Sequence, residues 1–89
     1  LSQNYPNPFN PTTKIRFDVA IDSRLHGNEN VVLKIFDIMG REVATLVNEQ
    51  KEPGYYEINF NASQFSSGVY IYRLQSNSFV STKKMLMIK

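Results

Sequence analysis

Short runs in which apolar and polar residues alternate constrain the fold of this chain more than any other feature of its sequence. From Thr13 onward the apolar residues Ile15, Phe17 and Val19 occupy every second position, and charged residues lie between them. Because successive side chains of an extended strand point to opposite faces, this run predicts a half-buried β-strand. No window shows the spacing of an amphipathic helix, so the sequence predicts an all-β protein.

Further runs with strand character follow at short intervals. They cover residues 31–36, 41–47, 55–60, 68–74 and 79–88. The first of these is apolar on both faces, which indicates a central strand or one whose outer face is covered by the proline-rich N-terminal segment. Polar loops or turns separate the runs, and the sequence shows no internal repeat. This spacing predicts an antiparallel β-sandwich of about seven strands, with a β-barrel of similar size as the alternative.

The segment Asp37-Ile38-Met39-Gly40 predicts a type I turn that connects two of these runs. Asp37 is suited to accept backbone hydrogen bonds at the first position, and Gly40 to adopt a left-handed conformation at the last. We therefore expect a hairpin in which the chain returns from Arg41 to Val47, followed by a polar loop over residues 48–53.

The N-terminal segment, which we call the strap (residues 1–12), is rich in proline and asparagine. Its three X-Pro steps restrict the preceding residues to extended or polyproline geometry and exclude a helix. Tyr5 and Phe9 are its large apolar residues, so we expect both rings to hold the strap against the body of the domain. Residues 13–89 would then form the sandwich, within a single domain.

The composition limits what else this chain can be. It has 89 residues, one histidine, no cysteine and no tryptophan, which fits one small domain without disulfide bonds. No apolar run approaches the roughly 18 residues that would cross a bilayer, and no charged segment precedes an apolar stretch at the start, so we expect this segment neither to span a membrane nor to begin a secreted precursor. Because the first residue is Leu1, we expect the chain to be a piece of a longer protein.

Charge is divided unevenly along the chain. Residues 1–67 hold six basic and eight acidic residues, whereas residues 68–89 hold Arg73 and the terminal lysines (Lys83, Lys84 and Lys89) with no acid. The C-terminal end is therefore the basic end. These lysines are too few to neutralise many phosphates, so nucleic-acid binding is not predicted. Two roles stay open for them: protecting an edge strand from pairing, or recognition by a protein partner.

The sequence offers no arrangement that predicts catalysis, a metal or a cofactor. His26 stands alone in a polar loop, without the partners of a metal site or a catalytic triad. Glycine-rich phosphate loops, nucleophile elbows and zinc-protease motifs are absent. Four acidic residues fall at outward or turn positions of the predicted strands, where solvated or turn-capping roles are expected. They are Asp18, Asp37, Glu42 and Glu57.

Tyrosines are the side chains with the clearest binding potential. Tyr55, Tyr56, Tyr70 and Tyr72 could include a platform on which sugar rings stack, but we expect most of these rings in the core. Tyr70 and Tyr72 share one strand face, so at least that face should be buried with its hydroxyls near the rim. The glycosylation sequon Asn61-Ala62-Ser63 is short enough to arise by chance and receives little weight.

Four motifs occur in order along nearly the whole chain. They are the opening segment Asn4-Tyr5-Pro6-Asn7-Pro8-Phe9-Asn10-Pro11, the middle segment Leu33-x-Ile35-Phe36-Asp37-x-x-Gly40-Arg41, the strand Gly68-Val69-Tyr70-x-Tyr72-Arg73-Leu74 and the closing segment Lys83-Lys84-Met85-x-x-Ile88-Lys89. Together they resemble the C-terminal sorting domains of type IX secretion substrates, also called Por secretion system type A sorting domains. The middle segment alone also resembles the immunoglobulin-like domain of flagellar hook-cap proteins.

The resemblance implies an immunoglobulin-like β-sandwich that performs no reaction and needs no cofactor. It implies a secretion address for a larger N-terminal cargo, which crosses the periplasm and then the outer membrane of a Bacteroidetes-type bacterium. The implied partners are the outer-membrane translocon of type IX secretion and its sortase-like peptidase. That peptidase would remove the domain while the cargo is released or attached to the cell surface.

The resemblance also assigns the sorting motif. Gly68 and Tyr70 match the Gly-x-Tyr strand of the family, and the terminal lysines match the lysines of its closing segment. Asp37, Gly40 and Arg41 match its turn motif. The residues themselves also allow a plainer interpretation, in which Gly68 permits a tight strand entry, Tyr70 fills the core and the lysines guard an edge.

Two features depart from the family pattern. The loop between Phe17 and Val31 is several residues longer than is usual, with Ile21 where a Leu-Pro step is frequent, and Phe60 stands where a tryptophan is common. The first departure affects a loop and the second affects core volume. Two other functions stay open: a carbohydrate-binding or cell-attachment module, which requires exposed tyrosine rings, and a structural immunoglobulin-like spacer, which would not depend on the terminal lysines.

Overall fold

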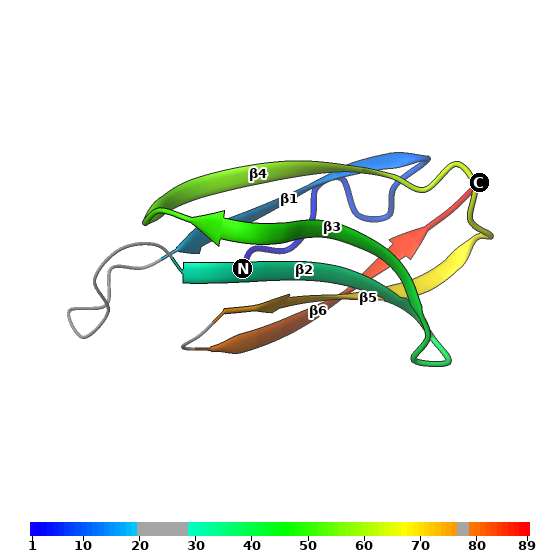
Figure 1. Cartoon of the computed structure of the whole chain (residues 1–89). Coiled ribbons are helices and arrows are strands. Elements are labelled where there is room, and N and C mark those ends of the chain that lie inside the picture. The colour runs from blue at the N-terminus through cyan, green and yellow to red at the C-terminus, as the bar shows by residue number, and fades with distance from the viewer. Residues whose placement is uncertain (20–28, 77–78) are drawn as a thin grey trace.

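The computed structural model of the protein describes residues 1–19, 29–76 and 79–89, and six strands lie in these ranges (Figure 1). They are β1 (Thr12–Val19), β2 (Glu29–Asp37), β3 (Glu42–Lys51), β4 (Gly54–Asn61), β5 (Gly68–Gln75) and β6 (Val80–Met87). The small sheet consists of β1 and β4, and the large sheet has the order β3-β2-β5-β6. Every pair of neighbouring strands is antiparallel. This confirms the predicted all-β antiparallel sandwich.

The strand count differs slightly from the expected seven. Within the described residues, the strap contributes two isolated bridges, Tyr5 to Lys14 and Phe9 to Met87, instead of a continuous strand. Its prolines lack the backbone N–H that a regular ladder requires. His26 and Ile21 lie outside the described residues.

The strand β2 is central in the large sheet, as its apolar character on both faces predicts. It pairs with β3 on one side and with β5 on the other. Its inward residues Leu33 and Ile35 are fully buried, and its outward residue Phe36 is half-buried. The guanidinium of Arg73, from β5, lies 4.7 Å from the centre of the Phe36 ring. A neighbouring strand, and not the strap, therefore covers the second apolar face of β2.

The core lies between the two sheets and is built from alternate residues of each strand. Leu33 faces Leu74 and Ile35 faces Tyr72 across β2 and β5, and all four are almost inaccessible to solvent. The small sheet contributes its own inward residues, and β6 contributes its two methionines. These are Thr13, Ile15, Phe17, Val19, Phe60, Met85 and Met87.

The strand β3 is longer than its composition predicts. It continues to Lys51, where the sequence indicated a polar loop from Asn48 onward. Asn48 lies opposite Val32 in the register, and Lys51 lies opposite Glu29. Because β3 is an edge strand whose end is largely exposed, polar side chains are compatible with continued backbone pairing there.

Candidate functional site

The strap joins the two sheets along one edge of the sandwich (Figure 1). Its first half follows β1, where the Tyr5 N–H donates to the Lys14 carbonyl at 3.0 Å and the Lys14 N–H donates back at 2.9 Å. Its second half follows β6, where the Phe9 N–H donates to the Leu86 carbonyl at 3.0 Å and the Ile88 N–H donates to the Phe9 carbonyl at 2.9 Å. The strap thus covers part of the backbone edge that β6 would otherwise expose.

Phe9 and Asn4 anchor the strap. The Phe9 ring is 2% exposed and packs against Phe60, with 6.2 Å between ring centres. Asn4 is also 2% exposed, and its amide Nδ2 donates to Thr13 Oγ1 at 3.0 Å. Tyr5 is 79% exposed, so the prediction that its ring holds the strap is wrong. Neighbouring residues of an extended segment face opposite ways, and burial of Asn4 turns Tyr5 outward.

The hydroxyl of Tyr72 connects the strap to the large sheet. It accepts a hydrogen bond from the Asn4 N–H at 2.9 Å and donates one to the Ser2 carbonyl at 2.8 Å. Tyr72 is fully buried, and this burial raises the pKa of its hydroxyl above the usual 10.0. One bond uses the oxygen of the Tyr72 hydroxyl as acceptor and the other uses its proton. The neutral hydroxyl therefore holds the strap against the large sheet.

Gly68 and Tyr70 form a tight corner where the chain enters β5. Gly68 has a φ of 155°, a conformation that residues with a side chain rarely adopt. The Tyr70 ring is 7% exposed, and its hydroxyl donates to the Ser66 carbonyl at 2.6 Å. This bond joins Tyr70 to a residue four positions earlier in the chain. The motif therefore connects the loop before β5 to the start of the strand.

The same corner occurs at the start of β4, and the sequence analysis missed it. Gly54 has a φ of 154°, and the Tyr56 hydroxyl donates to the Glu52 carbonyl at 2.6 Å. The signal was present, since Gly54-Tyr55-Tyr56 has the spacing of Gly68-Val69-Tyr70. Two copies of one local geometry show that the Gly-x-Tyr pattern has a structural role.

The terminal lysines do not share one face of the sheet. Lys83 lies opposite Tyr72 in the register, on the same face of β6 as Met85, which is buried in the core. Lys84 lies opposite Ile71 on the other side of the strand. A partner that contacts both lysines must therefore approach along the edge of β6, because adjacent side chains of a strand diverge.

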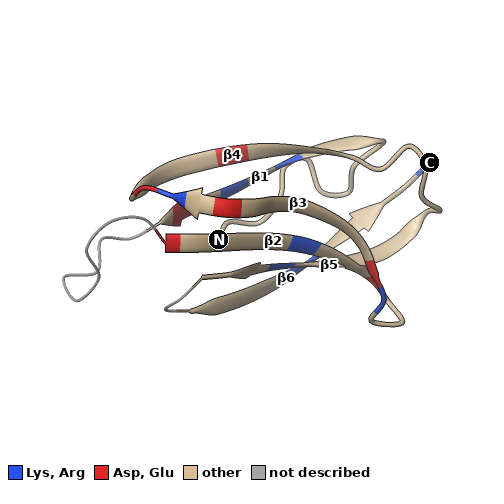
Figure 2. Cartoon of the chain, in the orientation of Figure 1, with Lys and Arg blue, Asp and Glu red and all other residues tan. Residues whose placement is uncertain are grey.

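Lys89 follows β6, and its backbone N–H donates to Ser67 Oγ at 2.9 Å. Figure 2 marks where the described basic and acidic residues lie along the ribbon. Among the described basic residues, the terminal lysines are the ones whose side chains contact no carboxylate and no ring. The others are occupied: Lys14 and Arg16 pair with Glu57, Lys34 with Glu42, Arg41 with Asp37 and Lys51 with Glu49, and Arg73 lies over Phe36. The terminal lysines therefore present uncompensated positive charge.

The turn motif is an internally bonded hairpin tip. The Gly40 N–H donates to the Asp37 carbonyl at 3.0 Å, and Gly40 has a φ of 84°, as the predicted turn requires. The Arg41 backbone N–H donates to Asp37 Oδ1, and its guanidinium donates to Oδ2, each at 2.9 Å. The backbone bond from Arg41, with a smaller contribution from its side chain, lowers the pKa of Asp37. These bonds give Asp37 and Arg41 a local structural role.

The acidic residues Asp18, Asp37, Glu42 and Glu57 lie outward or at turns, as predicted, whereas Glu29, the first residue of β2, is buried. Glu57 Oε2 accepts from Arg16 Nε at 2.7 Å, and this bond lowers the pKa of Glu57. Among residues 1–19, 29–76 and 79–89, no group of three or more His, Asp or Glu side chains is placed to hold a metal. The same ranges contain no helix long and apolar enough to cross a membrane.

Sequence reasoning missed three buried polar residues, Asn4, Thr13 and Glu29. Thr13 occupies the inward register of the run that continues with Ile15, so the alternation itself was the available signal. No pattern distinguished Asn4 from the exposed asparagines of the strap, because its burial depends on the distant hydroxyl of Tyr72.

Comparison of the sequence with known proteins places the chain in a family. No curated protein matches the chain. The family described as secretion system C-terminal sorting domain matches residues 3–89, which include all but the first two residues of the strap, both Gly-x-Tyr corners and the terminal lysines. Such domains are sorting signals that the type IX secretion machinery recognises, and they mark proteins for export to the cell surface or the extracellular space. The chain belongs to this family of secretion system C-terminal sorting domains.

Proposed function

We propose that this domain directs a larger N-terminal cargo protein through the outer membrane by type IX secretion. The cargo crosses the periplasm first, and the domain engages the outer-membrane translocon and its sortase-like peptidase. The peptidase removes the domain on export, and the cargo is released or attached to the cell surface. The observation that carries this proposal is the family match over residues 3–89.

The terminal lysines are the residues we assign to recognition. Their positive charge has no partner among the described residues, whereas the other described basic side chains are occupied within the domain. Uncompensated charge on an edge strand suits recognition of an acidic partner surface, because attraction between opposite charges guides association. Lys83 and Lys84 lie on opposite sides of β6, so the edge of the strand is the surface they have in common.

Gly68 and Tyr70 act in this proposal by positioning β6. Gly68 lies opposite Met87 and Tyr70 lies opposite Met85 in the register of β5 and β6. The corner that fixes the start of β5 therefore also fixes the strand that carries the lysines. Asp37 lies opposite Tyr70 on the other side of β5, so the turn motif is at the same end of the sandwich.

The test is a fusion of residues 1–89 behind a periplasmic reporter protein, produced in a host with type IX secretion. We expect the reporter in the medium or on the cell surface, shortened by removal of the domain. A matched host that lacks the translocon should retain the full-length fusion in the periplasm. Retention in the competent host, with the domain resistant to proteolysis and therefore folded, would contradict the proposal.

A further inference from the structure

The outer face of the small sheet is a polar surface bordered by two exposed tyrosines. Side chains of β1 and β4 face each other there in four successive pairs: Thr12 with Asn61, Lys14 with Asn59, Arg16 with Glu57 and Asp18 with Tyr55. The strap adds Tyr5, which is bridged to Lys14 on the other side of β1. We call this surface the β1–β4 face.

The rings of both tyrosines are largely exposed to solvent and do not contribute to the core. Tyr55 is 92% exposed and Tyr5 is 79% exposed. No hydrogen bond or ring contact joins either side chain to the rest of the described chain, in contrast to the bonded hydroxyls of Tyr56 and Tyr72. Tyrosine rings that do not contribute to the core are typical of binding surfaces, because the ring and the hydroxyl serve different parts of a ligand.

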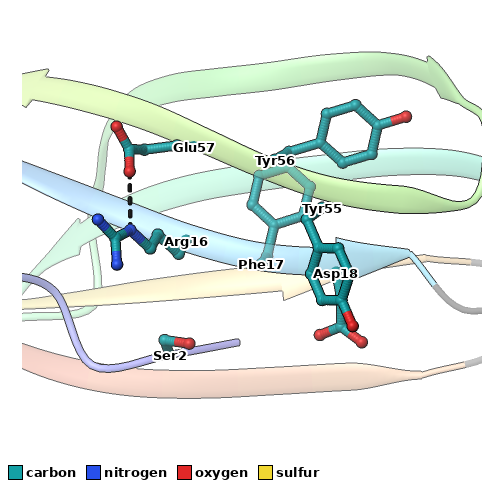
Figure 3. Close-up of a pocket in the computed structure, with 7 residues that line it drawn as sticks. All are labelled: Ser2, Arg16, Phe17, Asp18, Tyr55, Tyr56 and Glu57. Carbon is teal, nitrogen blue, oxygen red and sulfur yellow. Dashed lines mark hydrogen bonds and ion pairs between the residues drawn. The ribbon is translucent and has the colours of Figure 1, made fainter.

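Two hollows lie on this face and meet at Arg16. One, of about 330 Å³, is lined by Tyr55, Asp18 and Glu57 together with Arg16 (Figure 3). The other, of about 700 Å³, is lined by Tyr5, Asn59 and Asn61 together with Arg16 and Lys14. Each hollow thus combines one exposed ring with side chains that donate and accept hydrogen bonds.

The two rings are spaced for an extended ligand. Tyr5 lies in the row of Lys14 and Tyr55 lies in the row of Asp18, four residues further along β1. At about 3.3 Å per residue this is roughly 13 Å along the strand, and two strand spacings add about 10 Å across it. A chain of several sugar units can contact both rings, whereas one sugar cannot.

We infer that the β1–β4 face binds a neutral polysaccharide, an activity separate from sorting. The apolar faces of two sugar rings stack on Tyr5 and Tyr55. Between them, hydroxyl groups bond to Asn59 and to the pair of Arg16 and Glu57, whose atoms are held 2.7 Å apart. Asn61 lines the same hollow, and because its Oδ1 accepts from the Ser63 N–H at 2.9 Å, its Nδ2 group is the part left to donate to this ligand.

Charge favours a neutral glycan over a polyanion or an acidic protein. Lys14 and Arg16 supply two positive charges on the face, and Asp18 and Glu57 supply two negative charges. Both cations are already paired with Glu57, at 3.5 Å from Lys14 and 2.7 Å from Arg16. A face without net charge gains little from an ionic ligand, whereas stacking and hydrogen bonds depend little on salt.

The experiment is affinity electrophoresis of the 89-residue protein in native gels that contain hydroxyethylcellulose, glucomannan or xylan. We expect retardation by at least one of these polymers and the same association constant at low and high salt. Tyr5→Ala and Tyr55→Ala should each lower that constant about threefold to tenfold, the size of one aromatic contact, and the double variant should run as in an empty gel. The matched control is Ile38→Ala with Met39→Ala, which removes two equally exposed apolar side chains (72% and 77%) from the hairpin tip and should leave retardation unchanged.

Three results would overturn the inference. They are no retardation by any of the three polymers, undiminished retardation of the folded double tyrosine variant, or binding that disappears at high salt. The sorting function is assessed separately by export of the reporter fusion. If the double tyrosine variant loses export and the protein binds no polysaccharide, the β1–β4 face contacts the secretion machinery instead, and the glycan assignment is wrong.

Discussion

Gly68 has a conformational requirement that no other residue type satisfies well. Its φ is 155°, and a Cβ atom placed there would meet no atom within 4 Å, so strain and not collision is the cost of a side chain. We predict that Gly68→Ala lowers the free energy of unfolding by about 1–3 kcal/mol. Urea denaturation would show this as a lower midpoint with an unchanged slope. Gln64→Ala, at an exposed position of the preceding loop, is the control and should unfold like the parent protein.

The buried hydroxyl of Tyr72 makes stability depend on pH in the alkaline range. Tyr72→Phe removes the acceptor of the Asn4 N–H and should cost about 1–3 kcal/mol at neutral pH. The pKa of Tyr72 is raised in the folded protein, so the unfolded chain loses this proton first. The contribution of the hydroxyl is therefore complete below about pH 10 and declines as the pH rises toward the folded pKa.

Thermal unfolding of both proteins between pH 8 and 11 measures this dependence. The difference in melting temperature between the parent and Tyr72→Phe should be constant up to about pH 10 and should narrow above it. A difference that stays constant over the whole range would refute the assignment. Tyr55→Phe controls for the loss of a hydroxyl, because Tyr55 is 92% exposed and makes no bond within the described chain.

Some features of single residues are determined by their neighbours in the sequence, and others depend on distant parts of the chain. The turn at Asp37 and Gly40 follows from the four residues that form it, so the predicted backbone bonds to Asp37 and the predicted left-handed Gly40 are both confirmed. The burial of Asn4 requires Tyr72, 68 positions away in the chain, and no local pattern contains that information. Tyr5 is expected from the sequence to hold the strap against the domain because large aromatic rings are usually buried, and only the path of the backbone shows that it points outward.

At the scale of elements, the strap protects the edge of β6. The amides of Leu86 and Ile88 bond to Asn7 Oδ1 and to the Phe9 carbonyl, so these edge positions are covered although none of the described strands lies beyond them. Unpaired strand edges invite association with other chains. A strap held by one buried ring and a few hydrogen bonds covers this edge without a further strand.

Loosening the strap should expose these two amides selectively. We predict that Phe9→Leu, which keeps an apolar side chain but leaves space in the core, speeds hydrogen exchange at Leu86 and Ile88. Exchange at Met85 and Met87 should change less, because alternation along β6 directs their amides toward β5. NMR-detected exchange tests this, with the exposed variant Tyr5→Ala as the control. Equal acceleration at all four amides would indicate global unfolding and contradict the role of the strap.

The elements were predicted to different degrees for identifiable reasons. The strands with strict alternation or dense apolar residues, β1 and β5, were predicted almost to their ends, because burial of one or both faces determines their sequence. The predicted strand ended at Val47, whereas β3 continues to Lys51, because the last residues of an exposed edge strand need not be apolar. The pairing of the strap with both sheets was not predicted, since it depends on which strand edges are open in the folded domain.

At the scale of the whole molecule, the position of charge matters more than its sum. The formal net charge is only +2, and most described basic residues are neutralised by nearby acids. The terminal lysines have no such partners in the described structure, so replacing them removes no ion pair. Their loss should change the free energy of unfolding by less than about 0.5 kcal/mol, as is usual for exposed sites.

We predict that the triple variant Lys83→Gln, Lys84→Gln and Lys89→Gln folds normally and is poorly exported. The matched control replaces Lys14, Lys34 and Lys51 by Gln, which also takes the formal charge from +2 to −1 but removes lysines that are paired with acids. Export of the reporter fusion, melting temperature and sedimentation would be measured for both. If recognition depends on position, only the first variant is retained; if it depends on net charge, both are. Normal export of the first variant combined with self-association would instead show that the terminal lysines guard the edge of β6, because removing edge charge permits strand pairing between copies.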